Sequence, residues 1–187
     1  MEVSLPGKIQ FKIGNINLTE TSAPLIVPEI GINHNGKLET AIKMVDAAVK
    51  NGARIIKHQT HIPDDEMSVE AKKIKPGNSK KNIFSIIKKC SLNEEDEFKL
   101  MRYVRSKKVI FLSTPFSRKA VDRLIKFKVD AFKIGSGEFN NLPLINYITK
   151  FNRPMILSTG MNSLKDIKKI GNFLINKKIK FALLHTT

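Results

Sequence analysis

Short apolar runs alternate with amphipathic segments along most of the chain. The apolar runs have the length and composition of buried strands and span residues 25–30, 53–58, 109–113, 131–134, 155–158 and 180–185. Between them, apolar residues recur every three or four positions, as in amphipathic helices, over residues 37–51, 93–107, 117–127, 142–151 and 163–176. Strands that alternate with helices in this way predict repeated βα units around a parallel sheet.

Local signals support several of the predicted helix ends. The Asn-Gly pair at 51–52 is a typical C-terminal signal, and the acidic residues at 94–97 suit the positive end of a helix dipole. Ser163 precedes Asp166 by three positions, which resembles a capping box. These signals place helix ends where the periodicity also changes.

Two segments depart from the repeating pattern. Residues 1–22 contain alternating apolar positions followed by a Gly-Asn pair, which predicts a β-hairpin before the first βα unit. Residues 60–92 form a long insertion after the second strand, with a short apolar helix around 83–87. Insertions of this length at the end of a strand are typical of functional loops or lids.

Polar side chains occur where the predicted strands end, although strands buried on both faces are otherwise apolar. They are Glu29, Lys57, Gln59, Ser113, Thr114, Lys133, Ser136, Glu138, Ser158, Thr159, His185 and Thr186. In a doubly wound sheet only the strands beside the switch point share a ligand, whereas in a barrel all the C-terminal ends converge. We therefore predict an α/β fold of the (β/α)-barrel type. The 187 residues fall short of the roughly 250 that eight units need, so about six strands are expected.

Composition excludes several classes of function but does not indicate a particular one. The 33 Lys+Arg against 17 Asp+Glu give a net charge of +16, but the lysines are scattered and not interleaved with aromatic residues, which argues against nucleic-acid binding. A single cysteine, Cys90, excludes an internal disulfide, and no Cys/His cluster has zinc-ligand spacing. No run approaches the length of a membrane span and no signal peptide is evident, so we expect a cytoplasmic protein.

The strand-end residues suggest an enzyme that acts on a small anionic, phosphorylated substrate. Lys57 and Lys133 would supply ammonium groups, and the turn around Ser136 would supply backbone N–H groups. Glu29 and Glu138 would be carboxylates able to handle protons. Each residue also has a purely structural interpretation: a lysine can extend to solvent, a glutamate or serine can stabilise a turn, and the four histidines are more often structural than catalytic.

Several runs of residues together resemble one enzyme family. The sequences VPEIGINHNG, IIKHQTH, DEMS, FLSTPFS, AFKIGSGE, RPMILSTGMNS and LLHTT occur in the order and spacing of the bacterial N-acetylneuraminate (sialic acid) synthase family, from about Ala23 onward. The resemblance implies a TIM barrel, homodimers, and condensation of phosphoenolpyruvate with N-acetylmannosamine to give N-acetylneuraminate and phosphate. It also implies a divalent metal, manganese or magnesium, in the full-length enzymes.

The resemblance assigns roles to individual residues. Those that match phosphoenolpyruvate-binding positions are Lys57, Thr114, Lys133, Ser136 and Ser158. Glu29 and Glu138 match the catalytic carboxylates, while Gln59 and Asn78 match positions near the acceptor sugar. In the implied mechanism, C3 of phosphoenolpyruvate attacks the sugar aldehyde, water adds at C2, and the tetrahedral intermediate expels phosphate.

The sequence departs from the family pattern at its C-terminus. We interpret 1–22 as an extension and 23–187 as a truncated barrel domain; two further βα units with the metal-binding histidines and an antifreeze-like domain are absent. We therefore expect no metal ligand in this chain and no activity of the chain alone. Three alternatives remain: a legionaminic or pseudaminic acid synthase acting on a diacetamido sugar, another phosphoenolpyruvate-condensing or aldolase-type barrel, and a non-catalytic fragment.

Overall fold

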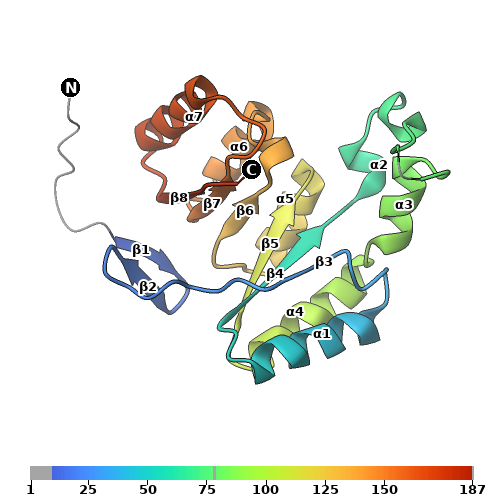
Figure 1. Cartoon of the computed structure of the whole chain (residues 1–187), viewed down its shortest axis with the longest axis horizontal. Coiled ribbons are helices and arrows are strands. Elements are labelled where there is room, and N and C mark those ends of the chain that lie inside the picture. The colour runs from blue at the N-terminus through green and yellow to red at the C-terminus, as the bar shows by residue number, and fades with distance from the viewer. Residues whose placement is uncertain (1–9, 78, 187) are drawn as a thin grey trace.

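A computed structural model describes residues 10–77 and 79–186, and its centre is a six-stranded parallel sheet (Figure 1). The strands are β3 (Glu29–Gly31), β4 (Ile55–Thr60), β5 (Ile110–Pro115), β6 (Phe132–Ile134), β7 (Met155–Ser158) and β8 (Phe181–Leu184). They are hydrogen-bonded in the order in which they occur in the chain. A doubly wound sheet reverses direction at a switch point, whereas an unbroken order is that of a barrel wall. The prediction of an incomplete (β/α) barrel with about six strands is confirmed.

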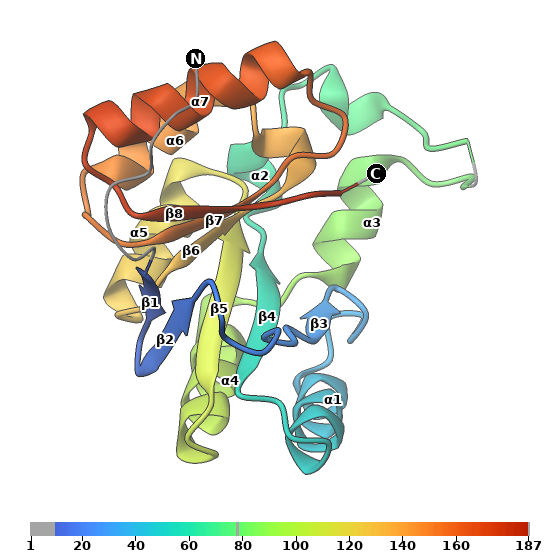
Figure 2. The ribbon, with the colours of Figure 1, turned by 60° about the vertical axis from the view of Figure 1, so that its left-hand side comes forward.

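Helices cover the outer face of the sheet, as Figures 1 and 2 show. They are α1 (Leu38–Lys50), α4 (Glu94–Ser106), α5 (Arg118–Lys126), α6 (Leu142–Thr149) and α7 (Leu164–Asn176). The apolar layer between helices and sheet contains Ile56, Phe111, Phe132 and Leu157 from the strands, all buried. Of the helices in the described ranges, none is long and apolar enough to cross a membrane.

An N-terminal hairpin covers part of the inner face of the sheet. Its strands β1 (Gln10–Ile13) and β2 (Ile16–Thr19) are antiparallel, as the sequence predicts for this region, and residues 1–9 lie outside the described ranges. The hairpin packs on a second apolar layer formed by Ile55, Ile110, Leu112, Ala131 and Ile156. Since Ile55 and Ile110 begin their strands, the hairpin covers the N-terminal end of the inner face.

The predicted insertion forms a folded excursion, here called the 61–92 segment. It contains α2 (Pro63–Glu66), the 3-10 turn η1 (Ala71–Lys73) and α3 (Ile83–Cys90). The short apolar helix expected around 83–87 is therefore present and is longer at its C-terminus. A second 3-10 turn, η2 (Ser136–Glu138), follows β6.

The strand predicted at 25–30 differs most from the structure. Only Glu29–Gly31 is a strand, so Glu29 begins β3 rather than ending it, and the pairing with β4 is irregular between Glu29 and Gly31. Prolines at 24 and 28 lack the N–H group that a ladder requires, which explains why the apolar run before Glu29 does not pair regularly. Nevertheless the carbonyl of Pro28 accepts a hydrogen bond from the Lys57 backbone at 2.8 Å, so the segment still follows β4.

A buried polar cluster fixes the orientation of β4. Glu97 of α4 is 1% exposed, accepts hydrogen bonds from Thr60 and from Arg123 (2.9 Å), and lies 3.4 Å from His58 Nε2. Burial opposes ionisation of this carboxyl group, but the contacts with His58, Thr60 and Arg123 outweigh it and hold the pKa of Glu97 below its usual value. His58 and Thr60 are thereby held on the outer face of the sheet. Because side chains alternate along a strand, Lys57 and Gln59 point to the inner face.

His34 completes this cluster from the loop before α1. Its ring stacks on His58 with centroids 5.3 Å apart, and its Nδ1 accepts a hydrogen bond from the backbone N–H of Gly36 (3.2 Å). Burial, reinforced by the charge of His58, lowers the pKa of His34 to about 4. The folded protein therefore holds this histidine neutral where an unfolded chain would protonate it.

Four helices end with the same backbone geometry, and three of them have a lysine where glycine is usual. Gly52, Lys108, Lys128 and Lys178 have φ between 55° and 84°. The residue after each donates a hydrogen bond back into the last helical turn, as Ile179 does to the carbonyl of Leu174 (3.0 Å). A side chain in this left-handed region costs about 1 kcal/mol or more.

We expect Lys178→Gly to raise the free energy of unfolding by about 1 kcal/mol, because glycine adopts the left-handed conformation without a Cβ clash. Urea unfolding followed by circular dichroism measures the change. Lys177→Gly is the matched control. Lys177 has φ −81°, so glycine there only increases the conformational entropy of the unfolded chain and should lower the free energy of unfolding. Equal effects of the two changes would contradict the explanation.

We also expect stability to fall as the pH is lowered from 6.5 towards 4. The unfolded chain gains a proton on His34 below its ordinary pKa of 6.5, while the folded chain does not until about 4. This difference corresponds to at most roughly 3 kcal/mol. His34→Asn, whose Oδ1 can accept from Gly36, should flatten the pH dependence in this range. His185→Asn changes an exposed position and should leave the pH dependence of stability unchanged. If stability falls equally with pH in the unchanged chain and in both variants, His34 is not the cause.

Candidate active site

The inner face of the sheet bears a cavity of about 370 Å³ in which an apolar wall surrounds a few polar groups. The polar residues are Glu29, Lys57, Lys133 and Ser158, and they come from β3, β4, β6 and β7. The apolar wall includes Leu112 and Ile156 of the sheet and Phe11 and Ile13 of the hairpin. Four of the residues predicted from the strand ends are thus brought together.

Lys133 is the most buried charged group of the cavity. Lys133 is 4% exposed. Its Nζ donates hydrogen bonds to Ser158 Oγ and to the carbonyl of Ile134, both at 2.6 Å. Burial is the main cause that lowers the pKa of Lys133 to about 8; the positive charge of Lys57 adds to it and Glu29 opposes it. Both hydrogen-bond acceptors of this ammonium are uncharged.

Lys57 and Glu29 form an ion pair at the opening of the cavity. They are opposite each other in the register of β3 and β4, and the lysine side chain is 15% exposed against 37% for the glutamate. The purely structural interpretation of Lys57, in which it extends into solvent, does not fit this pairing. Glu29 compensates the charge of Lys57 and leaves that of Lys133 without an adjoining carboxylate.

Gly31 keeps the space between Glu29 and Gln59 open. A Cβ atom on Gly31 would lie 2.9 Å from both Glu29 Oε1 and Gln59 Nε2, and the residue has φ +34°. Both the space and the conformation therefore favour glycine. Gly31 was not among the predicted site residues, and its only signal in the sequence is its place directly after the predicted strand 25–30.

The predicted hydroxyl groups have different surroundings. Thr114 Oγ1 is buried and has no hydrogen-bond partner within the described residues. Ser136 Oγ lies 3.2 Å from Thr186 Oγ1, which in turn accepts a hydrogen bond from the backbone N–H of Gly160. Thr186 therefore links the ends of β6, β7 and β8.

Glu138 lines a second pocket, and Gln59 contacts His61 of the same pocket. Gln59 Oε1 is 3.0 Å from His61 Nε2, and Glu138 Oε2 accepts a hydrogen bond from Asn141 Nδ2 (2.6 Å). Glu138 lines a pocket with His61 and Phe116. It does not line the cavity that contains Lys57 and Lys133, here called the lysine cavity. Asn78, the other residue predicted near the sugar, lies outside the described residues.

The side chains in the described ranges do not form a metal centre by themselves. In residues 10–77 and 79–186, no three His, Cys, Asp or Glu side chains are grouped so that they could hold a metal ion. Glu29 is engaged with Lys57, and Glu138 with Asn141. We assign no chemical step to a metal bound by these residues.

Several known proteins are similar to this chain in sequence. An N,N'-diacetyllegionaminic acid synthase of Campylobacter jejuni is 35% identical over 170 residues, which cover 87% of this chain and 51% of that protein. The spore coat polysaccharide biosynthesis protein SpsE of Bacillus subtilis is 37% identical over 158 residues, 84% of this chain and 42% of that protein. The chain thus spans about half the length of these relatives.

The structural comparison agrees with the sequence comparison. The crystal structure of the N-acetylneuraminic acid synthetase of Leptospira borgpetersenii, in complex with citrate, superposes with a TM-score of 0.83 at 26% identity, over 95% of this chain and 59% of that one. The profile of the NeuB family matches residues 44–187. The resemblance inferred from the strand-end motifs is therefore confirmed, and the chain belongs to the NeuB family.

Proposed function

We propose that the protein condenses phosphoenolpyruvate with an N-acetylated amino sugar, forming a sugar acid and releasing phosphate. Membership of the NeuB family and similarity to a legionaminic acid synthase support this reaction type. The observation that carries the proposal is the charge of the lysine cavity. Lys57 and Lys133 lie with a single carboxylate, that of Glu29, and the hydroxyl of Ser158 in a cavity whose other lining residues are apolar.

This arrangement favours an anion bound next to Lys133. Burying an ammonium group without a counter-ion costs free energy, and the same burial is the main cause that lowers the pKa of Lys133 to about 8. A phosphate or carboxylate group would replace the missing counter-charge and raise the pKa of Lys133 again. Phosphoenolpyruvate carries both groups on a small frame, which suits a cavity of about 370 Å³.

The hydroxyl groups near the strand ends would complete the site. Ser158 already contacts Lys133, and the buried Oγ1 of Thr114 has no hydrogen-bond partner among residues 10–77 and 79–186. Hydrogen-bond donors fixed in advance around an oxyanion stabilise charge that develops during a reaction. In this proposal Lys57, Lys133, Ser136, Ser158 and Thr114 hold phosphoenolpyruvate.

The two carboxylates would have separate tasks. Glu29 is paired with Lys57 and lies at the opening, so it would keep that lysine charged and oriented. Glu138 lies beside the second pocket with one oxygen bonded to Asn141, where it could exchange a proton with the attacked aldehyde or with water. A divalent metal, if the full protein uses one, would act as a Lewis acid.

We expect Lys133→Met to weaken phosphoenolpyruvate binding by at least about tenfold, because a charge-assisted hydrogen bond is lost. Isothermal titration calorimetry of the chain measures the dissociation constant. For the unchanged protein, affinity should decline as the pH rises through about 8, since Lys133 loses its proton around that pH. The variant should lack this decline.

The matched control is Lys180→Met, which removes an exposed lysine that directly precedes β8 and does not line the lysine cavity. It should bind phosphoenolpyruvate as the unchanged chain does, and circular dichroism should show all three proteins folded. Unaltered affinity in folded Lys133→Met would remove the lysine cavity from the proposed site.

A further inference from the structure

The loops that follow β6 and β7 are joined by the side chain of Asn162. This half-buried residue lies just before α7, and its Nδ2 donates hydrogen bonds to the carbonyls of Ser136 (3.0 Å) and Gly160 (2.6 Å). Its Oδ1 accepts a hydrogen bond from Asn140 Nδ2 at 2.7 Å. A carbonyl oxygen can only accept, so the two contacts of Nδ2 require an amide NH₂ group at this position.

Asn162 fixes the end of the turn η2 that carries Ser136. The other end of this turn is anchored by Phe139, which is fully buried in the apolar layer between the sheet and the helices. Ser136 is polar and only half-buried, so its position depends on hydrogen bonds. Its carbonyl accepts one from Phe139 N–H within the turn (3.3 Å) and a shorter one from Asn162 (3.0 Å). The link to another loop is therefore the one that places Ser136 relative to β7.

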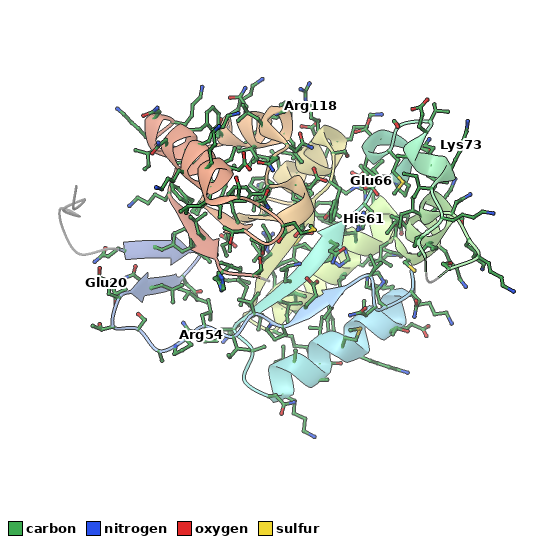
Figure 3. The ribbon with its side chains drawn as sticks, turned by 45° about the horizontal axis from the view of Figure 1, so that its top comes forward. Glu20, Arg54, His61, Glu66, Lys73 and Arg118 are labelled. Carbon is green, nitrogen blue, oxygen red and sulfur yellow. The ribbon has the colours of Figure 1, made fainter. Side chains whose placement is uncertain are left out.

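The loop after β4 is held in a different way. His61 Nδ1 lies 3.0 Å from Glu66 Oε1, and Figure 3 shows these two side chains together beyond the end of β4. Both residues belong to the 61–92 segment, so that loop is held by its own side chains. The turn after β6 instead takes its support from the loop of the next strand.

Gly160 allows the two loops to approach each other closely. A Cβ atom on Gly160 would lie 3.0 Å from Ser136 Oγ and 2.8 Å from Thr186 Oγ1. The φ of Gly160 lies outside the left-handed region, so space rather than backbone conformation is the constraint here. The hydroxyl of Ser136 thus lies directly against the loop that Asn162 stabilises.

The loop after β7 is itself strained at Met161. This residue has φ 63°, which is unfavourable for a residue with a Cβ atom, and it is 85% exposed, so packing contributes little to holding it. Strained backbone persists only where surrounding contacts enforce it. The hydrogen bond from Asn162 Nδ2 to the carbonyl of Gly160 is such a contact. One amide therefore stabilises both loops.

We propose that Asn162 is a positioning residue of the anion site: its amide holds the Ser136 hydroxyl where that group can donate to an oxygen of the bound anion. This inference rests on the function proposed above, in which Ser136 is one of the groups that hold phosphoenolpyruvate. Lys133 and Ser158 are joined directly to each other across β6 and β7. Ser136 has no such partner on a strand and depends on the contacts between the loops.

A double-mutant cycle tests this role. Isothermal titration calorimetry gives the dissociation constant of phosphoenolpyruvate for the unchanged chain, Asn162→Ala, Ser136→Ala and the double variant. We expect each single variant to bind about tenfold more weakly, since a hydrogen bond to a charged group is lost. In the Ser136→Ala background, Asn162→Ala should weaken binding by no more than about a further twofold, because the two residues act through one contact. An equal effect of Asn162→Ala in both backgrounds would overturn the proposal.

The resonances of the bound ligand give a readout that a general loss of stability would not move. The ³¹P and carboxylate ¹³C shifts of bound phosphoenolpyruvate should change in the same way in Asn162→Ala and in Ser136→Ala. The decline of affinity around pH 8 belongs to Lys133 and should stay in place in both variants. Ligand shifts in Asn162→Ala that match those of the unchanged chain would contradict the positioning role.

Two further variants act as controls. Asn172→Ala removes an exposed amide from α7 and should bind phosphoenolpyruvate as the unchanged chain does. Asn162→Leu keeps the approximate shape of the side chain without its hydrogen-bonding groups and should behave as Asn162→Ala. Unaltered affinity in folded Asn162→Leu would show that packing, not the amide, is what matters.

Asn140→Ala decides the question if the Asn162 variants do not fold, as circular dichroism would show. Asn140 is exposed, and its side chain orients the amide of Asn162. We expect its removal to weaken phosphoenolpyruvate binding about threefold, and this effect should disappear in the Ser136→Ala background. Unchanged affinity in Asn140→Ala would overturn the proposal in that case.

The outcomes separate this inference from the proposed function. Phosphoenolpyruvate binding that depends on Lys133 but not on Asn162 would overturn the positioning role and leave the proposed function standing. Failure of the unchanged chain to bind phosphoenolpyruvate would overturn the proposed function and this inference with it.

Discussion

The buried carboxylate of Glu97 determines which face of β4 supplies the site. It contacts His58 and Thr60 on the outer face of that strand and Arg123 of α5. A shift of one residue in a strand exchanges its two faces, so any register that released these contacts would also turn Lys57 and Gln59 away from the cavity. Removing one partner from a buried charged cluster costs several kcal/mol, which makes the alternative register unfavourable. A structural ion cluster on one side of the sheet thereby fixes the chemistry on the other.

The inner face is organised by an imbalance of charge. Glu29 neutralises Lys57, but Lys133 has only uncharged partners, and the protein stabilises its position through packing rather than through a counter-ion. Such a site is destabilised until an anion enters, so part of the binding free energy comes from relief of that cost. Before an anion binds, Ser158 Oγ accepts a hydrogen bond from the Lys133 ammonium, which can also donate to an oxygen of the ligand.

Much of the fold follows from local pattern, and the site follows from it in part. The alternation of strands and helices, and the polar residues at strand ends such as Lys133 and Ser158, were sufficient to predict a barrel wall with a cationic site. The apolar run before Glu29 predicts a strand, and this prediction is wrong because Pro28 within the run and Pro24 just before it lack the N–H group that regular pairing needs. The role of Glu97 was not predictable from the residues at 94–97, which read as acids at a helix N-terminus; its partners lie far away in sequence and only the fold brings them near. Gly31 and the contact of Gln59 with His61 likewise depend on distances between elements.

The hairpin has a consequence for the order of events at the site. Phe11 and Ile13 line the lysine cavity from the N-terminal end of the inner face, so a ligand would reach the buried Lys133 from the C-terminal ends of the strands. A molecule held against the second pocket would stand across that route. Under the proposed function, phosphoenolpyruvate would then have to bind before the sugar, and excess sugar would slow turnover by occupying sites that have not yet received their anion.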